Sequence, residues 1–546
     1  EGVRKTMQLT FYGADKEVTG SCHCLTVNGT RILIDCGLQQ GADETDNAVL
    51  PFLASSIDYV LVTHAHIDHS GRLPLLVKRG FHGEILATRK TCYLLSIMLR
   101  DSAHIQEMDA ETEARKGRRA GRQPKGPLYT LEDAEDTLKL LSHCEYGEFI
   151  ELCKGVRVRF TDAGHLLGSA FIEVWATEDG QTKKIVFSGD IGNKNQPIIR
   201  DPQYVYEGGD YAVMESTYGD REHDHMTDYR KPLADIIDNT LANGGNVVIP
   251  SFAVGRTQEL LYFIREIKER HMTPRNPNFP VYVDSPLASE ATAIYSGNLH
   301  GYADEETATL IENGYEPLRF ENLNITTSVE ESKALNTDGV PKVIISSSGM
   351  CEAGRIRHHL KHNLWRPECA IVFVGYQANG TLGRMLLDGM DSVKLFGEQI
   401  AVKAHIFNFR GLSGHADHTG LLAWIDAFRQ RPQKLFVVHG ERTCCEAFTS
   451  ELCMRGYDAV APEFSASFDL LTGRFTDEGI PPERLHPKRA MIAMSQGGRH
   501  YSAAYARLQQ AQKRLELVVQ HNEGGANKDL NRFTEELLAL CTKWDR

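Results

Sequence analysis

The pattern of apolar and polar residues along the first 220 positions predicts strands that alternate with helices. Asn28 and Gly29 separate two apolar runs within 25–35. This pair favours a type I′ turn, so we expect an antiparallel hairpin there. Further apolar runs predict strands at 59–62, 83–88, 156–160, 170–175, 184–187 and 211–215, and a long helix is expected at 90–114. The alternation indicates an α/β fold.

A second block repeats a unit of strand, loop and helix. Apolar runs at 245–250, 281–283, 343–346 and 371–374 each end in small or polar residues. This repetition predicts a parallel α/β domain inserted into the first fold. Ligands bind at the carboxyl ends of such strands, and backbone amides at helix starts attract phosphates. The candidate phosphate contacts are therefore Arg256, Ser347, Ser348, Gly349, Gly380 and Thr381. Ordinary loop and helix-capping roles are the alternative for each.

Strands expected at 402–407 and 434–438 indicate that the chain then returns to the first fold. The expected domains are 7–220 and 399–460 for the first fold, 221–398 for the inserted cap, and 461–546 for a helical extension. Apolar residues at helical spacing predict two amphipathic helices in that extension, at 501–519 and 530–541. They either dock on their own body or form a homodimer contact or a partner-binding element.

Composition places the chain among ordinary globular proteins. Its 546 residues exceed the size of a single core, and 41% hydrophobic with 24% charged residues excludes wholesale disorder. We expect a cytoplasmic protein with reduced cysteines, because no signal peptide or membrane span is evident. A net charge of −13 argues against a nucleic-acid coat. The basic run at 115–125 is expected to form a flexible loop, either simply solvated or guiding phosphates.

The strongest chemical signal is the segment 63–69, with the sequence Thr-His-Ala-His-Ile-Asp-His, on an expected strand-to-helix loop. His64 and His66 can converge on one ion, while Asp68 and His69 can face a second. Imidazole nitrogen with carboxylate oxygen suits zinc, and ligands for two ions indicate a two-metal hydrolase. A cluster of solvated loop histidines is the alternative.

Three further polar residues stand at expected strand ends. His165 and Asp190 each lie next to a glycine, and would supply a third imidazole to the first ion and a carboxylate that bridges both. Asp35 ends an earlier strand, where it either faces the metal loop or forms a turn.

These residues resemble the ligand set of the metallo-β-lactamase superfamily, whose fold is a four-layer αβ/βα sandwich with metals at the edge between two sheets. The resemblance implies one zinc at His64, His66 and His165, and a second at Asp68 and His69. It also implies that Asp190 bridges the ions and that Asp35 supports the cluster. Redox di-iron members place a glutamate among these ligands, whereas residues 65 and 66 are Ala and His here. Hydrolytic zinc chemistry is therefore favoured.

The chain further resembles the β-CASP nucleases, in which an α/β cap interrupts this fold. The matching pieces are Glu215, His415, His439, the Arg256 loop, 347–350 and 375–384, and the likeness spans nearly all of 7–460. Among relatives it looks most like bacterial counterparts of the nuclease subunit of the cleavage and polyadenylation specificity factor. The family assigns His439 to the second zinc, His415 to the scissile phosphate as general acid, and Glu215 to orienting His415. A histidine at 439 resembles the RNA-processing branch.

The expected activity is that of a ribonuclease that hydrolyses phosphodiester bonds of single-stranded RNA with two zinc ions, for which manganese is an alternative. Two other classes stay open. One is a superfamily hydrolase of small esters, thioesters or lactones, against which the large cap argues. The other is a non-catalytic RNA-binding scaffold, against which the complete ligand set argues.

Overall fold

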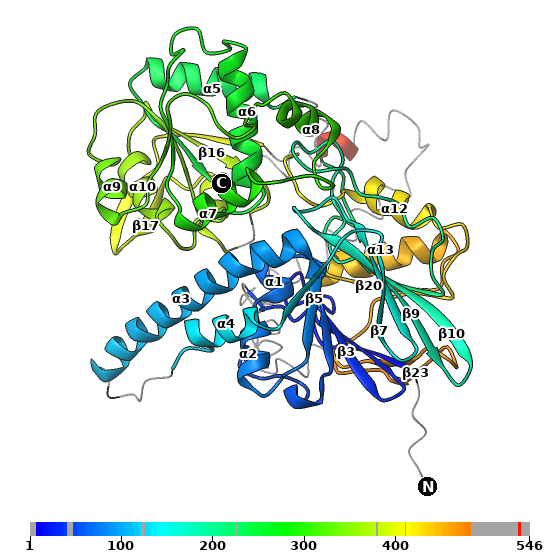
Figure 1. The fold of residues 1–546 in the computed structure, drawn as a ribbon. Helices are drawn as coiled ribbons and strands as arrows, with labels where there is room; N and C mark the ends of the chain where they lie inside the picture. Colours follow the sequence, from blue (N-terminus) through cyan, green and yellow to red (C-terminus); the bar gives the residue numbers. More distant parts are fainter. Residues whose placement is uncertain are drawn as a thin grey trace. The chain divides into compact units, whose positions relative to one another are not determined.

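A computed structural model describes residues 7–40, 47–119, 121, 126–223, 228–377, 380–409, 411–481 and 533–536. The chain divides into two compact units, Glu1–Gly479 and Ile480–Arg546. In the second unit only 533–536 are described beyond residue 481, and they are helical. The predicted helix at 501–519 and the rest of that at 530–541 lie outside the described residues. The first unit holds the helices and strands labelled in Figure 1.

An eight-stranded sheet contains the first strands of the chain, in the order β23-β22-β1-β2-β3-β4-β5-β6. The predicted hairpin at 25–35 is confirmed, and Asn28 and Gly29 have φ values of 50° and 83° in its turn. Such positive values are what a type I′ turn requires. The strands are β1 (Gln8–Phe11), β2 (His23–Val27), β3 (Thr30–Ile34), β4 (Tyr59–Leu61), β5 (Glu84–Thr88), β6 (Leu141–Cys144), β22 (Ser467–Asp469) and β23 (Arg474–Asp477).

A seven-stranded sheet packs against the first, in the order β21-β20-β11-β10-β9-β8-β7. Its strands are β7 (Phe149–Cys153), β8 (Val156–Asp162), β9 (Ala170–Glu178), β10 (Gln181–Phe187), β11 (Tyr211–Glu215), β20 (Lys434–Val438) and β21 (Ala459–Val460). Strand β8 alternates buried and half-buried residues, as the sequence pattern predicts. Its buried residues Val158 and Phe160 meet Leu9 and Phe11 of the first sheet in one apolar core.

Helices cover the outer face of each sheet, which completes the four predicted layers. The first sheet carries α1 (Ile67–Ser70), α2 (Leu73–Lys78), α3 (Arg89–Arg119) and α4 (Leu131–Leu138). The second carries α12 (His418–Asp426) and α13 (Arg442–Met454). A short 3-10 helix, Ala54–Ser56, precedes β4. No helix among the described residues has the length and apolar character needed to cross a membrane.

The inserted cap has a six-stranded sheet, all parallel, in the order β14-β13-β15-β12-β16-β19. Alternate residues of β12 face opposite sides, so Val247 and Ile249 join one core and Val248 the other. The strands are β12 (Val247–Pro250), β13 (Val281–Val283), β14 (Leu323–Ile325), β15 (Val343–Ser346), β16 (Ala370–Val374) and β19 (His405–Phe409), with a separate hairpin of β17 (Ser392–Leu395) and β18 (Glu398–Ala401).

Helices lie on both faces of the cap sheet (Figure 1). One face packs against α5 (Arg230–Ala242), α6 (Arg256–Glu269) and α7 (Pro286–Tyr295), and the other against α10 (Ile356–Asn363) and α11 (Leu382–Leu387). The remaining helices of the cap are α8 (Glu305–Glu312) and α9 (Val329–Ala334). The predicted parallel α/β insertion is thereby confirmed.

Three sequence expectations differ from the structure. Strand β19 pairs with β16, so the cap sheet continues to Phe409 rather than ending at 398. Residues 467–477 form β22 and β23 beside β1, so the extension expected at 461–546 does not begin with helices. Helix α3 continues to Arg119, so residues 115–119 of the expected basic loop are helical. Lysine and arginine are good helix formers, which explains the longer helix.

Asp284, which follows β13, is the polar centre of the cap. Its carboxylate is fully buried and accepts hydrogen bonds from His359 Nε2 at 2.6 Å, Ser332 Oγ at 2.6 Å and Arg355 Nη1 at 2.7 Å. These contacts join segments that are 48 to 75 residues from Asp284 in sequence. The carboxylate therefore fixes β13 to the helices around it.

We expect Asp284→Ala to lower the free energy of unfolding of the cap by about 3–5 kcal/mol, because it leaves buried cationic and polar partners uncompensated. Urea unfolding followed by tryptophan fluorescence and circular dichroism measures the change. Asp136→Ala is the control, since that carboxylate is half exposed and forms a surface ion pair with Lys139, and its cost should stay below about 1 kcal/mol. Equal losses in the two variants would contradict the role of Asp284.

Candidate metal centre

The predicted metal ligands meet at one edge of the sandwich, beyond the carboxyl ends of several strands. His64 and His66 follow β4, and His165 lies between β8 and β9. Asp190 follows β10, and His439 follows β20. Strands β10, β11 and β20 are parallel, so their carboxyl ends reach the same edge. The local sequence explains this placement, since each buried apolar strand gives way there to small and polar residues.

Asp68 and His69 lie in α1, a helix of four residues, and not on an extended loop. The amide groups of His69 and Ser70 donate to the carbonyl of His66, at 3.0 Å in both cases. The tight turn brings the side chains of 64–69 to one side of the strand end. It therefore separates His64 and His66 from Asp68 and His69 in the way that the spacing predicts.

The first cluster consists of His64, His66, His165 and Asp190. His66 Nδ1 lies 3.0 Å from His64 Nε2 and 3.2 Å from His165 Nε2. Asp190 Oδ2 lies 3.3 Å from His64 Nε2 and 3.4 Å from His165 Nε2. Three ring nitrogens and one carboxylate oxygen thus point at one position.

The second cluster consists of Asp68, His69 and His439. His69 Nε2 lies 3.1 Å from His439 Nε2, and Asp68 Oδ2 lies 3.5 Å from the same His439 nitrogen. The other oxygen of Asp190, Oδ1, lies 3.2 Å from His69 Nε2 and 3.6 Å from His439 Nε2. Asp190 therefore faces one cluster with each oxygen.

The chemistry of this donor set fits divalent cations. Burial and the neighbouring imidazoles lower the pKa values of His64, His66 and His165, to about 3 for His66. These rings are therefore neutral near pH 7, with a nitrogen lone pair available to a cation. Asp190 Oδ1 is buried and accepts no hydrogen bond from the described residues. Neutral imidazoles beside ionised carboxylates are the ligands that zinc prefers.

Polar groups from distant segments orient the ligating rings. Asp35 Oδ2 lies 2.7 Å from His69 Nδ1, and the amide of Thr63 donates to Asp35 Oδ1 at 2.8 Å. The carbonyl oxygen of Gly414 accepts from His165 Nδ1 at 3.0 Å. Partners of this kind fix which ring nitrogen faces a metal. The carboxylate of Asp35 therefore lies beside the metal loop, which is one of the two roles expected for it from the sequence.

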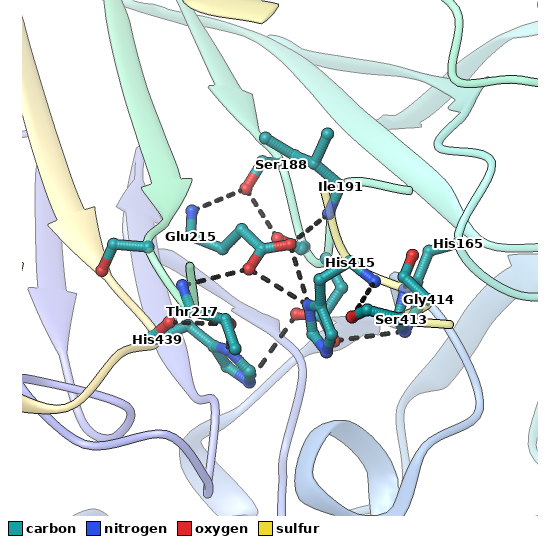
Figure 2. Close-up of polar contacts among 12 residues, drawn as sticks. His165, Ser188, Ile191, Glu215, Thr217, Ser413, Gly414, His415 and His439 are labelled. Carbon is teal, nitrogen blue, oxygen red and sulfur yellow. Dashed lines mark hydrogen bonds and ion pairs between the residues drawn. The ribbon is translucent and has the colours of Figure 1, made fainter. Parts of the chain in front are cut away.

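The half-buried His415 pairs with the buried Glu215 beside the two clusters (Figure 2). His415 Nδ1 lies 3.1 Å from Glu215 Oε1, and His415 Nε2 lies 3.9 Å from Asp190 Oδ2. Burial acts to lower the pKa of His415, but the carboxylates of Glu215 and Asp190 raise it to about 9. The ring is therefore protonated near pH 7, and its Nε2 faces the centre.

Glu215 is held in place by backbone groups (Figure 2). The amides of Ile191 and Thr217 donate to its two carboxylate oxygens, the latter at 3.3 Å. Glu215 itself is fully buried at the end of β11. Two backbone donors and one imidazole thus fix the carboxylate, which in turn fixes the ring of His415.

Several residues of the site carry no signal that the sequence analysis used. Thr63 holds Asp35, and Thr217 Oγ1 lies 3.1 Å from His439 Nδ1. Gly414 contacts His165 through its backbone carbonyl, so the residue type gives no sign of this contact. The general need of a ligating histidine for a second partner indicates that such groups exist, but only the fold identifies them.

Aromatic residues border the site where the cap meets the first fold. The ring of Tyr218 lies 6.2 Å from that of His415, and the guanidinium of Arg221 lies 4.8 Å from the Tyr218 ring. The same guanidinium lies 5.7 Å from the ring of Tyr376 in the cap. Tyr376 donates from its hydroxyl to Glu441 Oε1 at 3.2 Å. This group beside His415 was not predicted from the sequence.

The predicted phosphate contacts lie in loops at the carboxyl ends of the cap strands. Loops 347–352 and 377–383 touch, because Gln377 Nε2 donates to the carbonyl of Gly349 at 3.0 Å and the amide of Gly383 donates to that of Met350 at 3.2 Å. A Cβ on Gly349 would lie 3.0 Å from the ring of Phe252, so these loops are closely packed.

Several of these residues already have partners in the protein. Arg256 is 8% exposed and pairs with Glu259. Ser347 Oγ lies 2.8 Å from Ser285 Oγ, and Ser348 contacts Ala353. Thr381 caps α11, and a Cβ built on Gly380, whose φ is 85°, would meet no atom of the described residues within 4 Å. Their role towards a phosphate stays a prediction.

Family models match three parts of the chain. A metallo-beta-lactamase superfamily model matches residues 16–143, and a Beta-Casp domain model matches 257–386. A model described as a Zn-dependent metallo-hydrolase RNA specificity domain matches 399–462. Together these segments include most of the residues that surround the two clusters.

Curated relatives resemble the chain over most of its length. It is 37% identical to "Ribonuclease TTHA0252" of Thermus thermophilus over 459 residues, which is 84% of this chain and 99% of that protein. It is 30% identical to "Transcription termination factor FttA" of Methanosarcina mazei, over 82% of this chain and 69% of that protein. The factor of the same name from Methanothermobacter thermautotrophicus is also 30% identical, over 80% and 67%.

The position of Asp190 between the clusters leads to a prediction about metal content. We expect two divalent ions per chain, one ion in His439→Ala, and fewer than one in Asp190→Ala, because both oxygens of Asp190 are lost together. Inductively coupled plasma mass spectrometry after dialysis measures the content.

His82→Ala removes an exposed histidine and serves as the control, with two ions retained. Equal metal content in Asp190→Ala and His82→Ala would contradict a shared carboxylate.

Proposed function

Because this chain belongs to the β-CASP ribonuclease family of the metallo-β-lactamase superfamily, we propose that it hydrolyses phosphodiester bonds of single-stranded RNA with two zinc ions and with His415 as general acid. The observation that carries the proposal is the pair of ligand clusters joined by Asp190, with a protonated imidazole at their side. Manganese is the alternative metal, since oxygen and nitrogen ligands accept both.

The first ion would be held by His64, His66, His165 and Asp190, and the second by Asp68, His69, His439 and Asp190. When bound, two such cations supply an activated water and neutralise charge on the phosphoryl oxygens. The protein itself positions these ligands through Asp35, Thr63, Thr217 and Gly414. These partners keep the rings aligned whether or not substrate is present.

His415 would protonate the departing ribose oxygen. The ribose oxygen would leave as an alkoxide unless a proton reaches it in the transition state, and a positioned acid contributes about 10²–10⁴-fold to the rate. Glu215 acts through His415, because it raises the pKa of the ring and aims Nε2 towards the centre. Glu215 is therefore a positioning residue.

Single-stranded RNA is supported by the surroundings of the site. The relatives above include a protein named a ribonuclease, and a histidine stands at position 439, as in the RNA-processing branch that the sequence resembles. Arg221 between Tyr218 and Tyr376 offers a cation and ring faces beside His415. Positive groups interleaved with aromatic rings are typical of single-strand binding. A homodimer contact through the extension stays a proposal for residues beyond 481.

The alternative substrate class, small esters, thioesters or lactones, has less support. Such a substrate is small and needs no cap domain to bind it. A fully buried glutamate devoted to one histidine also suits a poor leaving group better than a good one.

We predict that His415→Ala lowers kcat for RNA by about 10²–10³-fold, while cleavage of bis(p-nitrophenyl) phosphate falls by less than about threefold. The nitrophenolate leaving group needs no proton, so it bypasses the acid. Glu215→Gln should fall between wild type and His415→Ala on RNA. Steady-state kinetics on both substrates measures the difference. Equal losses on the two substrates would exclude His415 as the acid.

A second prediction concerns substrate class. Zinc-loaded protein should cleave labelled single-stranded RNA at least about tenfold faster than an RNA duplex, because a duplex is wider and stiffer than a single strand. It should also cleave the equivalent single-stranded DNA at least about tenfold more slowly, because that strand lacks the 2′-hydroxyl by which a protein distinguishes RNA. It should leave a thioester intact. Denaturing gels and a thiol assay give the readouts, with His415→Ala and His82→Ala as inactive and active controls. Intact RNA together with thioester turnover would reverse the assignment.

A further inference from the structure

A cavity lies between the first fold and the cap, and none of the metal ligands lines it. Its volume is about 830 Å³. Its walls come from the start of α3, from 145–147 and 200–203 in the first fold, and from 293–302 in the cap. Helices α3 and α7 lie side by side next to it (Figure 1). The residues that matter below are Arg89, Lys90, Tyr93, Tyr146, Arg200 and Tyr302.

Lys90 is the unusual residue of this cavity. The residue is 5% exposed, yet no carboxylate among the described residues lies within ion-pair distance of its ammonium group. The ammonium instead lies 5.6 Å from the ring of Tyr93 and 6.0 Å from that of Tyr302. Lys90 lines the cavity, and contacts with ring faces offset only part of the cost of taking a cation out of bulk water.

The other charges around the cavity are paired within the protein. Arg89 pairs with Glu145, and the hydroxyl of Tyr302 donates to the same carboxylate at 2.9 Å. Arg200 Nη2 lies 2.9 Å from Asp162 Oδ2. His300 also lines the cavity. Arg89, Lys90 and Arg200 therefore line the cavity with one carboxylate, Glu145, while Asp162 lies outside the lining. One positive charge is in surplus, and Lys90 is the cation without an ion pair among the described residues.

Ring faces lie next to this surplus charge. Tyr93 is 48% exposed, so a large part of its side chain is open to a ligand. The rings of Tyr146 and Tyr302 lie 5.1 Å apart, and the Arg200 guanidinium lies 5.5 Å from the Tyr146 ring. An anionic group would form an ion pair with Lys90, and a flat aromatic group would stack on the ring of Tyr93. A nucleotide carries both groups on one unit.

We propose that this cavity binds one nucleotide of the RNA strand, with its phosphate at Lys90 and its base against Tyr93. This inference rests on the function proposed above and adds a subsite to it. Burial lowers the pKa of Lys90, which an incoming phosphate would raise again. The volume of about 830 Å³ exceeds what a single ordered water requires and lies in the range of ligand pockets.

The wall of the cavity connects directly to the metal centre. Tyr146 donates from its hydroxyl to the carbonyl of Ser169 at 2.8 Å, and Ser169 Oγ accepts from the amide of His165 at 3.0 Å. From the cap, the Tyr295 hydroxyl accepts from the amide of Leu167 at 3.3 Å. The short loop 165–169 thus carries the metal ligand His165 at one end and contacts the cavity wall through Ser169 at the other.

The test compares substrates that do and do not reach the cavity. We expect Lys90→Met and Tyr93→Ala each to raise KM for an RNA of about 20 nucleotides by about tenfold, as loss of one phosphate contact or one stacked base predicts. Neither variant should change kcat/KM for bis(p-nitrophenyl) phosphate. Lys90→Arg, which keeps the charge, should retain most of the RNA affinity.

Matched controls are Lys139→Met and Tyr206→Ala, since both residues are exposed and neither lines the cavity. An unchanged KM for RNA in Lys90→Met and Tyr93→Ala would overturn the proposal. Parallel losses on RNA and on bis(p-nitrophenyl) phosphate would overturn it as well, because they indicate damage to the His165 loop. Tyr93→Ala removes an exposed ring and keeps the test open if Lys90→Met fails to fold.

A direct binding experiment separates this proposal from the ribonuclease proposal. Adenosine 5′-monophosphate should bind zinc-loaded protein in isothermal titration calorimetry at a site that Lys90→Met abolishes and Lys139→Met retains. If inorganic phosphate bound as tightly as adenosine 5′-monophosphate, the proposed stacking of the base on Tyr93 would be overturned. Wild-type protein that leaves RNA intact but binds the nucleotide at Lys90 would overturn the ribonuclease assignment and support the cavity as a nucleotide site.

Discussion

The convergence of ring nitrogens and carboxylate oxygens on two neighbouring positions is the constraint on which the structure depends. Lone pairs repel one another, and burial removes the water that would otherwise solvate them. Hydrogen bonds between the rings, such as that of His69 with His439, satisfy part of this set. Cations would satisfy all of it, so the fold must hold the ligands together until cations bind. The ligands span residues 64 to 439 and come from both sheets of the sandwich. Apolar packing between the sheets therefore provides the energy that keeps the lone pairs together.

Much of this arrangement could be predicted from the sequence, because strand ends have a local signature. Apolar runs that stop at His64, His165, Asp190 and His439 indicate both a buried strand and the edge at which it ends. Parallel strands share that edge, so residues far apart in sequence can be assigned to one site. The inserted cap was predictable on the same ground. The residue types of Asn28 and Gly29 were enough to predict the conformation of the hairpin turn.

Other features depended on information that the sequence does not carry locally. Strand β19 looks equally suited to either domain, and only pairing with β16 assigns it to the cap. Strands β22 and β23 have three and four residues, too few for a periodic pattern. The carbonyl of Gly414 that orients His165 belongs to the backbone, so residue type does not indicate it. The surplus positive charge at Lys90 depends on three chain segments that meet only in the fold. Long-range pairing decides such features, whereas local composition decides strand ends.

The pairing of β1 with β22 joins residues at positions 8 and 469, nearly the whole unit apart. During translation, the first strand leaves the ribosome long before its neighbour exists, so its outer edge stays unpaired for most of synthesis. His439 also emerges late, which delays completion of the second ligand cluster until most of the polypeptide is made. An RNA-cutting centre assembled in this order stays incomplete for most of the time that the protein is tethered to its own messenger.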